Sequence, residues 1–515
     1  MTKSYRYAWL GLALFAGGPT ACQAQPQAAA TAGPVKGARF EMGINLSSID
    51  YYSGEYAFMN LLTGSHWVDT KDKWQDLPDS QIDSLGMVRQ MPAGASYARI
   101  LTPPSAVFTG RTVSIRCTWT GSGDVSIGGS RKNLFRSDHS LTFDWPAAPP
   151  PEGNSRNWLE LSNMSAADPV RDVDCREKGA PRDQVFATQF VDSLKPFSVI
   201  RFLDWSSANP NPDTFTWANR SLPNGINQVD RARGVALEQM LALAKAADAD
   251  PWFTIPWNAD ADYVTRMAKL VHDRLPPGHR AYVELANEPW NYAFPLAHQI
   301  QKEGLAAGLD TNGFQANLKR YSQKTIATMR IWSAAFADRP ASLVRVAGSQ
   351  AVNPWATEQI LAYPGLPDAI DAVAIAPYFQ YDASAALTAP LPERLASLRR
   401  GQANVLAQAW KTLDLVRGKG KRLITYEGGQ HVTDFTPGGG ERVQQVNRSP
   451  EMERLYRDYI AAWKARVGDL MVLYNATGPA GGGGAWGIRE YAGQPLDQTP
   501  KRRAALAFAR QTATP

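Results

Sequence analysis

Ala281-Tyr282-Val283-Glu284-Leu285-Ala286-Asn287-Glu288-Pro289-Trp290-Asn291 is the stretch that decides how the rest of the chain is interpreted. It starts with β-strand formers and shows no helical spacing. Asn287 and Glu288 then end the apolar run, and Pro289 cannot donate to a continuing strand ladder. A carboxylate therefore stands at the carboxyl end of a strand, where parallel α/β barrels carry their catalytic residues. Taken alone, the stretch also fits a strand that ends in a turn with a solvated Glu288.

A second apolar run, 421–431, ends in the same way at Glu427. Taken alone, this residue also fits a surface glutamate. About three βα units separate the two acids, which is the spacing between strands four and seven of a barrel. Strand alternation places Glu284 on the same face as Glu288 but deeper, where a buried carboxylate needs a cationic partner. The two strand ends together predict a shared mouth with two carboxylates.

The rest of the chain repeats the alternation of strand and helix. Strands are expected at 40–46, 197–205, 251–258, 281–288, 342–350, 370–378, 421–431 and 469–476. Helical segments separate most of them, as parallel crossovers require. Eight such repeats predict a closed (β/α)8 barrel, a TIM barrel. The alternative, a doubly wound open sheet, does not place two carboxylates across one mouth.

Residues 93–182 break this rhythm. Short alternating runs recur there between Gly, Asp, Ser and Pro residues, which is typical of a small antiparallel β domain of sandwich type. The barrel is therefore expected to comprise 38–92 and 183–500, with the β domain inserted between its first two strands. This domain binds sugar or serves only as a wall of the cleft, and the sequence leaves both open. Aromatic residues between 51 and 74 likewise fit either a cleft lining or a packed loop.

The N-terminus has the features of an export signal. Basic residues precede a short apolar run, and residues 1–24 are interpreted as a signal peptide followed by a flexible linker at 25–37. Thr20-Ala21-Cys22 resembles a lipoprotein box, which would make Cys22 a lipidation site and anchor the protein to a membrane. Ordinary cleavage after Ala24 or within 28–30 is the alternative. Both routes predict an exported protein in the periplasm, on the outer membrane or outside the cell.

The remaining cysteines and the charge limit the partners. Cys117 and Cys175 both fall in the β domain, and in an exported protein a disulfide between them is expected; two separate buried thiols are the alternative. The net charge of +6 is mild and evenly spread, which argues against nucleic acid as a partner. The six His are scattered without ligand spacing, so no metal site is expected. No later stretch is long and apolar enough to span a membrane, and a monomer is expected.

Glu-Leu-Ala-Asn-Glu-Pro at 284–289 and Tyr-Glu-Gly-Gly at 426–429 resemble two strand ends of the clan A glycoside hydrolases. Members of this clan are (β/α)8 barrels, and the resemblance covers roughly 38–92 and 185–495. It implies that Glu288 is the general acid/base and Glu427 the nucleophile, kept ionised by a nearby cation. It also implies that Asn287 contacts the sugar 2-hydroxyl. No particular family within the clan is matched.

Other positions carry the resemblance further. Arg201 matches the strand-two arginine that supports the nucleophile, with an ion pair to Glu284 as the other role for it. Tyr378 matches the strand-six tyrosine that bonds the nucleophile, and Trp486 the tryptophan on which a sugar stacks beyond the last strand; a mobile glycine-rich loop is the alternative there. At strand three the clan commonly has His, whereas this chain has Trp257 and Asn258, which are taken as substrate contacts.

The expected function is an exported glycoside hydrolase that cleaves β-glycosidic bonds of a polysaccharide or oligosaccharide with retention of configuration. Two carboxylates suffice for this chemistry, so no cofactor is expected. A transglycosylase uses the same covalent intermediate and is the nearest alternative. A non-catalytic glycan-binding surface lipoprotein and a structural envelope lipoprotein are the alternatives from other classes. The sugar and the linkage do not follow from the sequence.

Overall fold

Eight parallel strands form the central sheet, in the order β16-β15-β14-β13-β12-β11-β1-β17. The computed structural model describes residues 38–148, 156–229, 233–382 and 387–510, so the predicted signal peptide, Cys22 and the linker lie outside it. The strands are β1 Met42–Asn45, β11 Val199–Arg201, β12 Asp250–Ile255, β13 Ala281–Leu285, β14 Leu343–Gly348, β15 Ala372–Ile375, β16 Arg422–Thr425 and β17 Met471–Leu473.

The two end strands of this sheet meet and close it. The Thr425 backbone N–H donates to the Leu470 carbonyl at 3.2 Å, and the Thr425 hydroxyl donates to the Val472 carbonyl at 3.0 Å and accepts from its N–H at 2.7 Å. The predicted (β/α)8 barrel is therefore confirmed, and the open doubly wound sheet is excluded.

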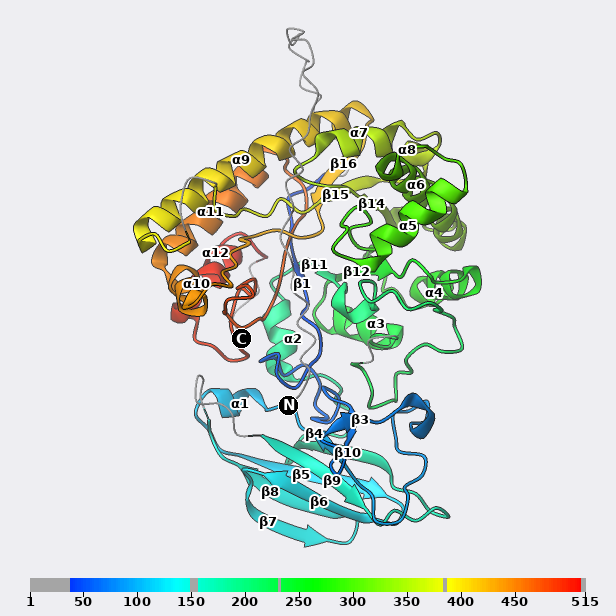
Figure 1. The fold of residues 1–515 in the computed structure, drawn as a ribbon, viewed down its shortest axis with the longest axis vertical. Coiled ribbons are helices and arrows are strands. Elements are labelled where there is room, and N and C mark those ends of the chain that lie inside the picture. Colours follow the sequence, from blue (N-terminus) through cyan, green and yellow to red (C-terminus); the bar gives the residue numbers. More distant parts are fainter. Residues whose placement is uncertain (1–37, 149–155, 230–232, 383–386, 511–515) are drawn as a thin grey trace.

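Helices connect the strands and surround the barrel in the upper part of Figure 1. They are α2 Thr188–Leu194, α3 Leu237–Ala246, α4 Ala261–Arg274, α5 Pro295–Ala306, α6 Gly313–Ala335, α7 Pro354–Ala362, α8 Leu366–Ala369, α9 Leu391–Gly418, α10 Gly439–Arg448, α11 Pro450–Arg466 and α12 Pro500–Leu506. Local signals set their starts: Asp260 caps α4 by accepting the Tyr263 N–H, and Asn312 caps α6. No helix in the described part of the chain is long and apolar enough to cross a membrane.

Side-chain alternation divides each barrel strand between an inner and an outer face. Trp252, Tyr282 and Tyr426 belong to a small core cluster inside the barrel, whereas Phe253 and Val283 belong to the larger core shared with the helices. The interior is tight near β1, because a Cβ at Gly43 would lie 2.8 Å from Val472 Cγ2. The inner face is the one that carries the polar groups of the candidate site.

The inserted β unit lies below the barrel in Figure 1 and is built from two antiparallel sheets. One sheet has the order β10-β5-β8-β7 and the other β3-β2-β4-β9-β6. Their strands are β2 Trp67–Asp69, β3 Gln75–Asp76, β4 Ser96–Ile100, β5 Val113–Thr120, β6 Asp124–Gly129, β7 Lys132–Ser137, β8 Ser140–Trp145, β9 Asn157–Ser162 and β10 Arg171–Glu177, with a short helix α1 at Ser105–Phe108. The antiparallel character and the insertion between the first two barrel strands are as predicted.

The start of this β unit corrects the predicted domain boundary at residue 92. β2 and β3 were expected in the barrel, but β2 pairs with β4, placing Trp67 opposite Arg99. Trp67 is buried and its indole N–H donates to the Gly86 carbonyl at 2.9 Å. The chain therefore leaves the barrel before residue 67. Of the aromatic residues of 51–74, Tyr56, Phe58 and Trp67 are buried, while Tyr52 and Trp74 are exposed.

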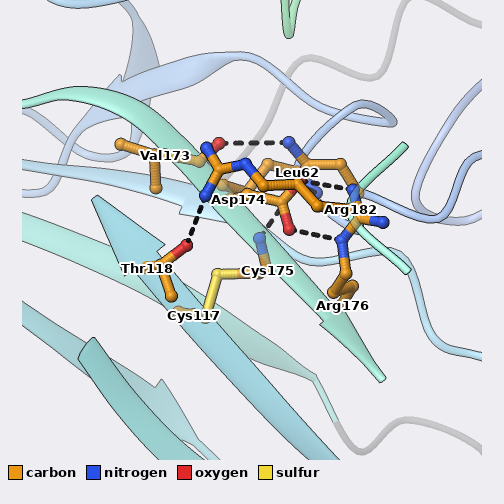
Figure 2. Close-up of a disulfide and its surroundings, with 9 residues drawn as sticks. Leu62, Cys117, Thr118, Val173, Asp174, Cys175, Arg176 and Arg182 are labelled. Carbon is orange, nitrogen blue, oxygen red and sulfur yellow. Dashed lines mark hydrogen bonds and ion pairs between the residues drawn. A yellow bond between two sulfur atoms is a disulfide. The ribbon is translucent and has the colours of Figure 1, made fainter. Parts of the chain in front are cut away.

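A disulfide joins Cys117 of β5 to Cys175 of β10, the predicted pairing, at positions directly opposite in the ladder. Figure 2 shows it beside an Asp174–Arg176 ion pair of 2.6 Å and the bond from Arg182 to Thr118. The Cys175 carbonyl accepts the Leu61 N–H at 2.7 Å. The disulfide-bonded strand is thus also the strand that holds the first barrel loop.

Candidate active site

Glu288 lies just beyond the carboxyl end of β13, where the backbone turns sharply. Ala286 and Glu288 both have positive φ angles, of 58° and 45°, a conformation that costs non-glycine residues of the order of 1 kcal/mol and clusters at functional sites. The Glu288 carboxylate accepts the Tyr426 hydroxyl at 2.9 Å and the Asn291 amide at 2.8 Å. It is partly exposed, unlike the buried strand beneath it.

Glu427 lies beyond the end of β16 and is only 1% exposed. One carboxylate oxygen accepts Arg201 Nη1 at 2.8 Å, and the other accepts the Tyr378 hydroxyl at 2.8 Å. The glycines that follow allow this close packing, because Gly429 has φ +124° and a Cβ there would lie 2.5 Å from the Tyr456 hydroxyl. Glu427 is therefore fixed by charged and neutral donors on both oxygens.

Arg201 is the centre of the buried network. It is fully buried, and each of its five N–H groups donates a hydrogen bond. Two go to Glu284, at 2.8 and 2.5 Å. The other three go to Glu427 at 2.8 Å, Asn45 at 3.1 Å and Asn287 at 2.9 Å. Its guanidinium also lies between two rings, 5.7 Å from the Trp252 centroid and 4.9 Å from that of Tyr426. Both roles expected for Arg201, support of Glu427 and an ion pair with Glu284, are present together.

Burial dominates the electrostatics of this network. It raises the pKa of Glu427 to about 8, and the charge of Glu288 adds to the rise, while Arg201 and the Tyr378 hydroxyl oppose it. Burial also raises the pKa of Glu284, against the attraction of Arg201. For Arg201, burial lowers the pKa but the two carboxylates raise it more, so the net shift is upward. The cation expected beside Glu427 is present, yet the carboxyl remains harder to ionise than an exposed one.

Aromatic side chains extend the site on the side of β16 and β17. The Tyr378 ring lies 5.8 Å from that of His431, which lies 5.5 Å from Trp486. Trp486 Nε1 lies 3.3 Å from His431 Nδ1, and its ring lies 6.4 Å from Tyr474. The structure therefore places Trp486 against His431 and Tyr474, with His431 between it and Tyr378, and its stacking on a sugar stays a prediction.

The loop that carries Trp486 is anchored to the barrel. The Ala485 carbonyl accepts both the Gln430 amide and the Lys501 ammonium. Gln430 and Lys501 are buried, and burial lowers the pKa of Lys501 to about 7. Because Gln430 follows the Glu427 turn, the same segment positions both Glu427 and Trp486.

Trp257 does not join this site, contrary to the sequence prediction, and in the described part of the chain Asn258 bonds neither Glu288 nor Glu427. Trp257 is fully buried and donates from Nε1 to Glu303 at 3.0 Å, with Lys324 over its ring at 4.4 Å. Asn258 donates to the Pro212 carbonyl at 3.1 Å and accepts from Gln299 at 2.7 Å. The buried Trp257 side chain is therefore not available to a sugar at the carboxylates, whereas Asn258 is partly exposed and its contact with substrate stays a prediction.

Several residues of the site were not singled out from the sequence. Asn45 donates to the Tyr426 and Leu473 carbonyls, Tyr426 bonds Glu288, and Tyr474 bonds Asp204 at 3.2 Å. All of these residues stand at or just beyond strand ends, which is the signal that could have identified them. Among the described residues, no cluster of three or more His, Cys, Asp or Glu side chains could hold a metal ion.

The Asn287 side chain is buried, and its amide donates to Asn209 at 3.0 Å while its oxygen accepts from Arg201. Its contact with a sugar hydroxyl stays a prediction.

No family model and no curated protein matches the chain. Among solved structures it is similar to a 4-O-α-L-rhamnosyl-β-D-glucuronidase from Fusarium oxysporum, with 13% identity, a TM-score of 0.37 and coverage of 62% of this chain and 63% of that one. It is similar to a GH51 arabinofuranosidase from Xanthomonas axonopodis pv. citri, with 13% identity, a TM-score of 0.36 and coverage of 59% and 62%. An endo-β-1,4-glucanase from the same organism has 10% identity, a TM-score of 0.34 and coverage of 64% and 94%. The matches thus span less than two thirds of the first two proteins.

Proposed function

We propose that the protein is an exported glycoside hydrolase that cleaves β-glycosidic bonds of a polysaccharide or oligosaccharide by double displacement. The observation that carries the proposal is the pair of carboxylates at the ends of β13 and β16, close enough that the charge of Glu288 raises the pKa of Glu427. Glycoside cleavage needs one carboxyl group to protonate the leaving oxygen and another to stabilise or attack the anomeric carbon. Glu288 and Glu427 have the environments that suit these two tasks.

The donors around Glu427 support its assignment as the nucleophile. Arg201 and Tyr378 hold both of its oxygens and oppose the rise in its pKa that burial causes, so they favour the ionised form that attacks the anomeric carbon. Glu288 is held by two neutral donors and is partly exposed, as a group that exchanges protons with a leaving oxygen and with water requires. Retention itself is inferred from the clan resemblance.

In the proposed first step, Glu288 transfers its proton to the glycosidic oxygen while a Glu427 oxygen bonds to the anomeric carbon. The bond from that carbon to the leaving oxygen breaks, and a glycosyl ester forms. In the second step, the ionised Glu288 takes a proton from water, whose oxygen bonds to the anomeric carbon as the ester bond breaks. Glu427 is released ionised and Glu288 protonated, so the cycle closes. If a sugar hydroxyl replaces water, the same groups perform transglycosylation.

Export is part of the proposal. The disulfide between Cys117 and Cys175 supports it, because such bonds persist in oxidising compartments outside the cytosol. We further propose that lipidated Cys22 anchors the protein to a membrane and that the protein acts as a monomer on carbohydrate. Palmitate labelling of cells that express the full chain tests the anchor: incorporation that is lost in C22A is expected, and no incorporation removes this part of the proposal.

Chemical rescue tests the catalytic proposal. In E427A, azide is expected to restore cleavage of aryl β-glycosides and to give the α-glycosyl azide, because azide takes the place of the nucleophile. In E288A, azide is expected to intercept the glycosyl ester and give the β-glycosyl azide. Rescue of E427A to the β-azide, or full activity of either variant, contradicts the proposal. Glycan binding without cleavage by the unaltered protein favours the non-catalytic alternative.

A further inference from the structure

A third carboxylate, Asp204, lies at the same end of the barrel and has no role in the two-step mechanism. It stands in the short 3₁₀ turn Asp204–Ser206 that follows β11, after Arg201 on that strand. The Tyr474 hydroxyl, just beyond β17, donates to it at 3.2 Å, and the Ser48 amide beyond β1 also bonds it. Because β1 lies between β11 and β17 in the sheet, the ends of three neighbouring strands converge on this side chain.

The Asp204–Tyr474 pair belongs to the mouth that holds Glu427. The Tyr474 ring contacts Trp486, and the charges of both Asp204 and Glu427 raise the pKa of Tyr474. Asp204, Tyr474 and Trp486 are each partly exposed, whereas Arg201 beneath them is fully buried. Tyr474 thus links Asp204 to Trp486, the expected stacking ring, and to the surroundings of Glu427.

Asp204 retains free acceptor capacity. Among the described residues it forms no ion pair, and Arg201, the cation that acts on both Asp204 and Glu427, has its N–H groups committed to other partners. Burial raises the pKa of Asp204 to about 6, and the Tyr474 hydroxyl and the charge of Arg201 oppose the rise by stabilising the ionised form. An ionised carboxylate is an acceptor only, with about four lone-pair positions, and two of its donors are already identified.

We propose that Asp204, oriented by Tyr474, accepts hydrogen bonds from hydroxyl groups of the sugar bound next to Glu427 and makes the site selective for neutral sugars over uronic acids. The inference rests on the proposed glycosidase function and adds the substrate class to it. Sugar hydroxyls supply the donors that the open lone pairs of Asp204 require, and charge-assisted bonds of this kind are about twice as strong as neutral ones.

A uronic acid, which carries a carboxylate of its own, would be repelled at this end of the barrel. Its carboxylate would approach the ionised Asp204 and Glu427, and like charges in a partly desolvated site repel strongly. The guanidinium of Arg201 cannot turn to it without leaving Glu284 or Glu427 unpaired, which is costly in a buried site. Discrimination therefore comes both from the hydroxyl bonds gained by a neutral sugar and from the repulsion felt by a charged one.

The test compares matched aryl glycosides that differ only at C6, a β-hexoside and the corresponding β-hexuronide, in the gluco, galacto and manno series. The pair that is turned over fastest is then measured with the unaltered protein, D204N, Y474F and D213N. Asp213 is an exposed acid in the loop after the same strand, so D213N removes the same charge away from the mouth. Thermal melting confirms that each variant is folded.

We expect the unaltered protein to favour the neutral sugar in kcat/KM by about a hundredfold or more, the size of two lost or repelled polar contacts. In D204N the ratio should fall at least tenfold, because the neutral sugar loses rate and the uronide is no longer repelled by this group. Y474F should shift the ratio in the same direction by less, and D213N should leave it unchanged.

A preference of the unaltered protein for the uronide, or equal ratios in D204N and D213N, overturns the inference while leaving the glycosidase proposal in place, provided that turnover is lost in E427Q. No Glu427-dependent turnover on either sugar overturns the proposed function and this inference with it.

Discussion

The segments after β12 and β16 are alike in sequence, because in each an apolar strand is followed by an aromatic and a polar residue. Their side chains nevertheless lie on different sides of the barrel wall. After β16, Tyr426 and Glu427 reach Glu288 and Arg201. After β12, Trp257 is buried against Glu303, outside the barrel. Position on the strand explains the difference, because Thr254 is the last inward side chain of β12 and bonds Glu284 at 2.6 Å.

This comparison teaches that a polar or aromatic strand end joins the site only when its side chain falls on the inner face or when the backbone turns beyond the strand. Trp257 shares the parity of Phe253 and Ile255, which pack against the helices. Glu427 escapes that rule because β16 ends at Thr425 and the glycines after Glu427 allow a tight turn. The following variants compare the two strand ends, from the largest expected effect to the smallest.

Neutralising one carboxylate in each region, Glu427 after β16 and Glu303 beside Trp257, should give the largest difference between the two regions. E427Q is expected to lower kcat/KM by about four orders of magnitude or more, because the group that bonds to the anomeric carbon is lost. E303Q, the matched change beside Trp257, should lower it less than about tenfold, since Glu303 touches only structural partners. Steady-state kinetics of the folded variants with an aryl glycoside measure both. Comparable losses in the two variants would contradict the conclusion that the β16 end belongs to the active site and Trp257 does not.

The hydroxyl that holds Glu427 should have the next largest effect. Y378F is expected to lower kcat/KM by about a hundredfold, the usual cost of one donor to a developing or fixed charge in an active site. The Tyr378 hydroxyl opposes the rise in the pKa of Glu427, so its loss should raise that pKa further. The ascending limb of the pH profile of kcat/KM should therefore move to higher pH.

Y459F is the control for this change. Tyr459 is fully buried, whereas Tyr378 is partly exposed, and the Tyr459 hydroxyl donates to the Pro377 carbonyl at 2.7 Å and touches neither carboxylate. It should alter stability without moving the ascending limb. An unmoved limb in Y378F, or the same shift in both variants, would show that Tyr378 does not set the ionisation of Glu427.

The two tryptophans should differ by a smaller factor. W486A is expected to raise KM for an oligosaccharide about tenfold, because a stacked ring is worth of the order of 1 kcal/mol. W257F should leave KM unchanged and lower the melting temperature instead, because this ring fills the packing between the barrel and its helices. An equal rise of KM in both variants would place Trp257 in the substrate path after all.

The smallest expected effect concerns stability and pH. The pKa of Glu427 is about 8 in the folded protein, above the ordinary value of 4.5, so the native state binds the proton more tightly and loses stability as pH rises from about 4.5 towards 8. The melting temperature of the unaltered protein should fall more between pH 5 and pH 8 than that of E427Q, by a few degrees. Both proteins keep Asp204 and Glu284, so their difference isolates Glu427. Parallel melting curves would contradict the assignment.

The sequence was sufficient for the fold and for the groups whose partners lie at strand ends. Eight strand signals with helices between them predict closure, and Glu288, Glu427, Arg201 and Tyr378 could be placed because each lies in the carboxyl-terminal half of a predicted strand and matches a position of the clan. The inner or outer parity of β12 could not be obtained in the same way, because it depends on the register between strands. Trp257 was misplaced for that reason.

The domain boundary and the outer part of the mouth could not be predicted from the sequence either. β2 and β3 are short strands whose pairing with β4 is a long-range contact, so local patterns left residues 67–76 in the barrel. Asp204 and Tyr474 come together only because β1 separates β11 from β17 by one strand in the closed sheet. No residue near either of them in the sequence predicts this contact.

The central claim, that Glu427 forms the covalent glycosyl bond, is tested most directly by trapping with activated 2-deoxy-2-fluoro glycosides and mapping the labelled peptide. The fluorine slows the second step, so the ester accumulates when the first step is fast enough. The account predicts a mass increase of one glycosyl unit on the peptide that contains Glu427, and no label in E427Q. A label on another carboxylate, or no label with any sugar while aryl glycosides are cleaved, would contradict it.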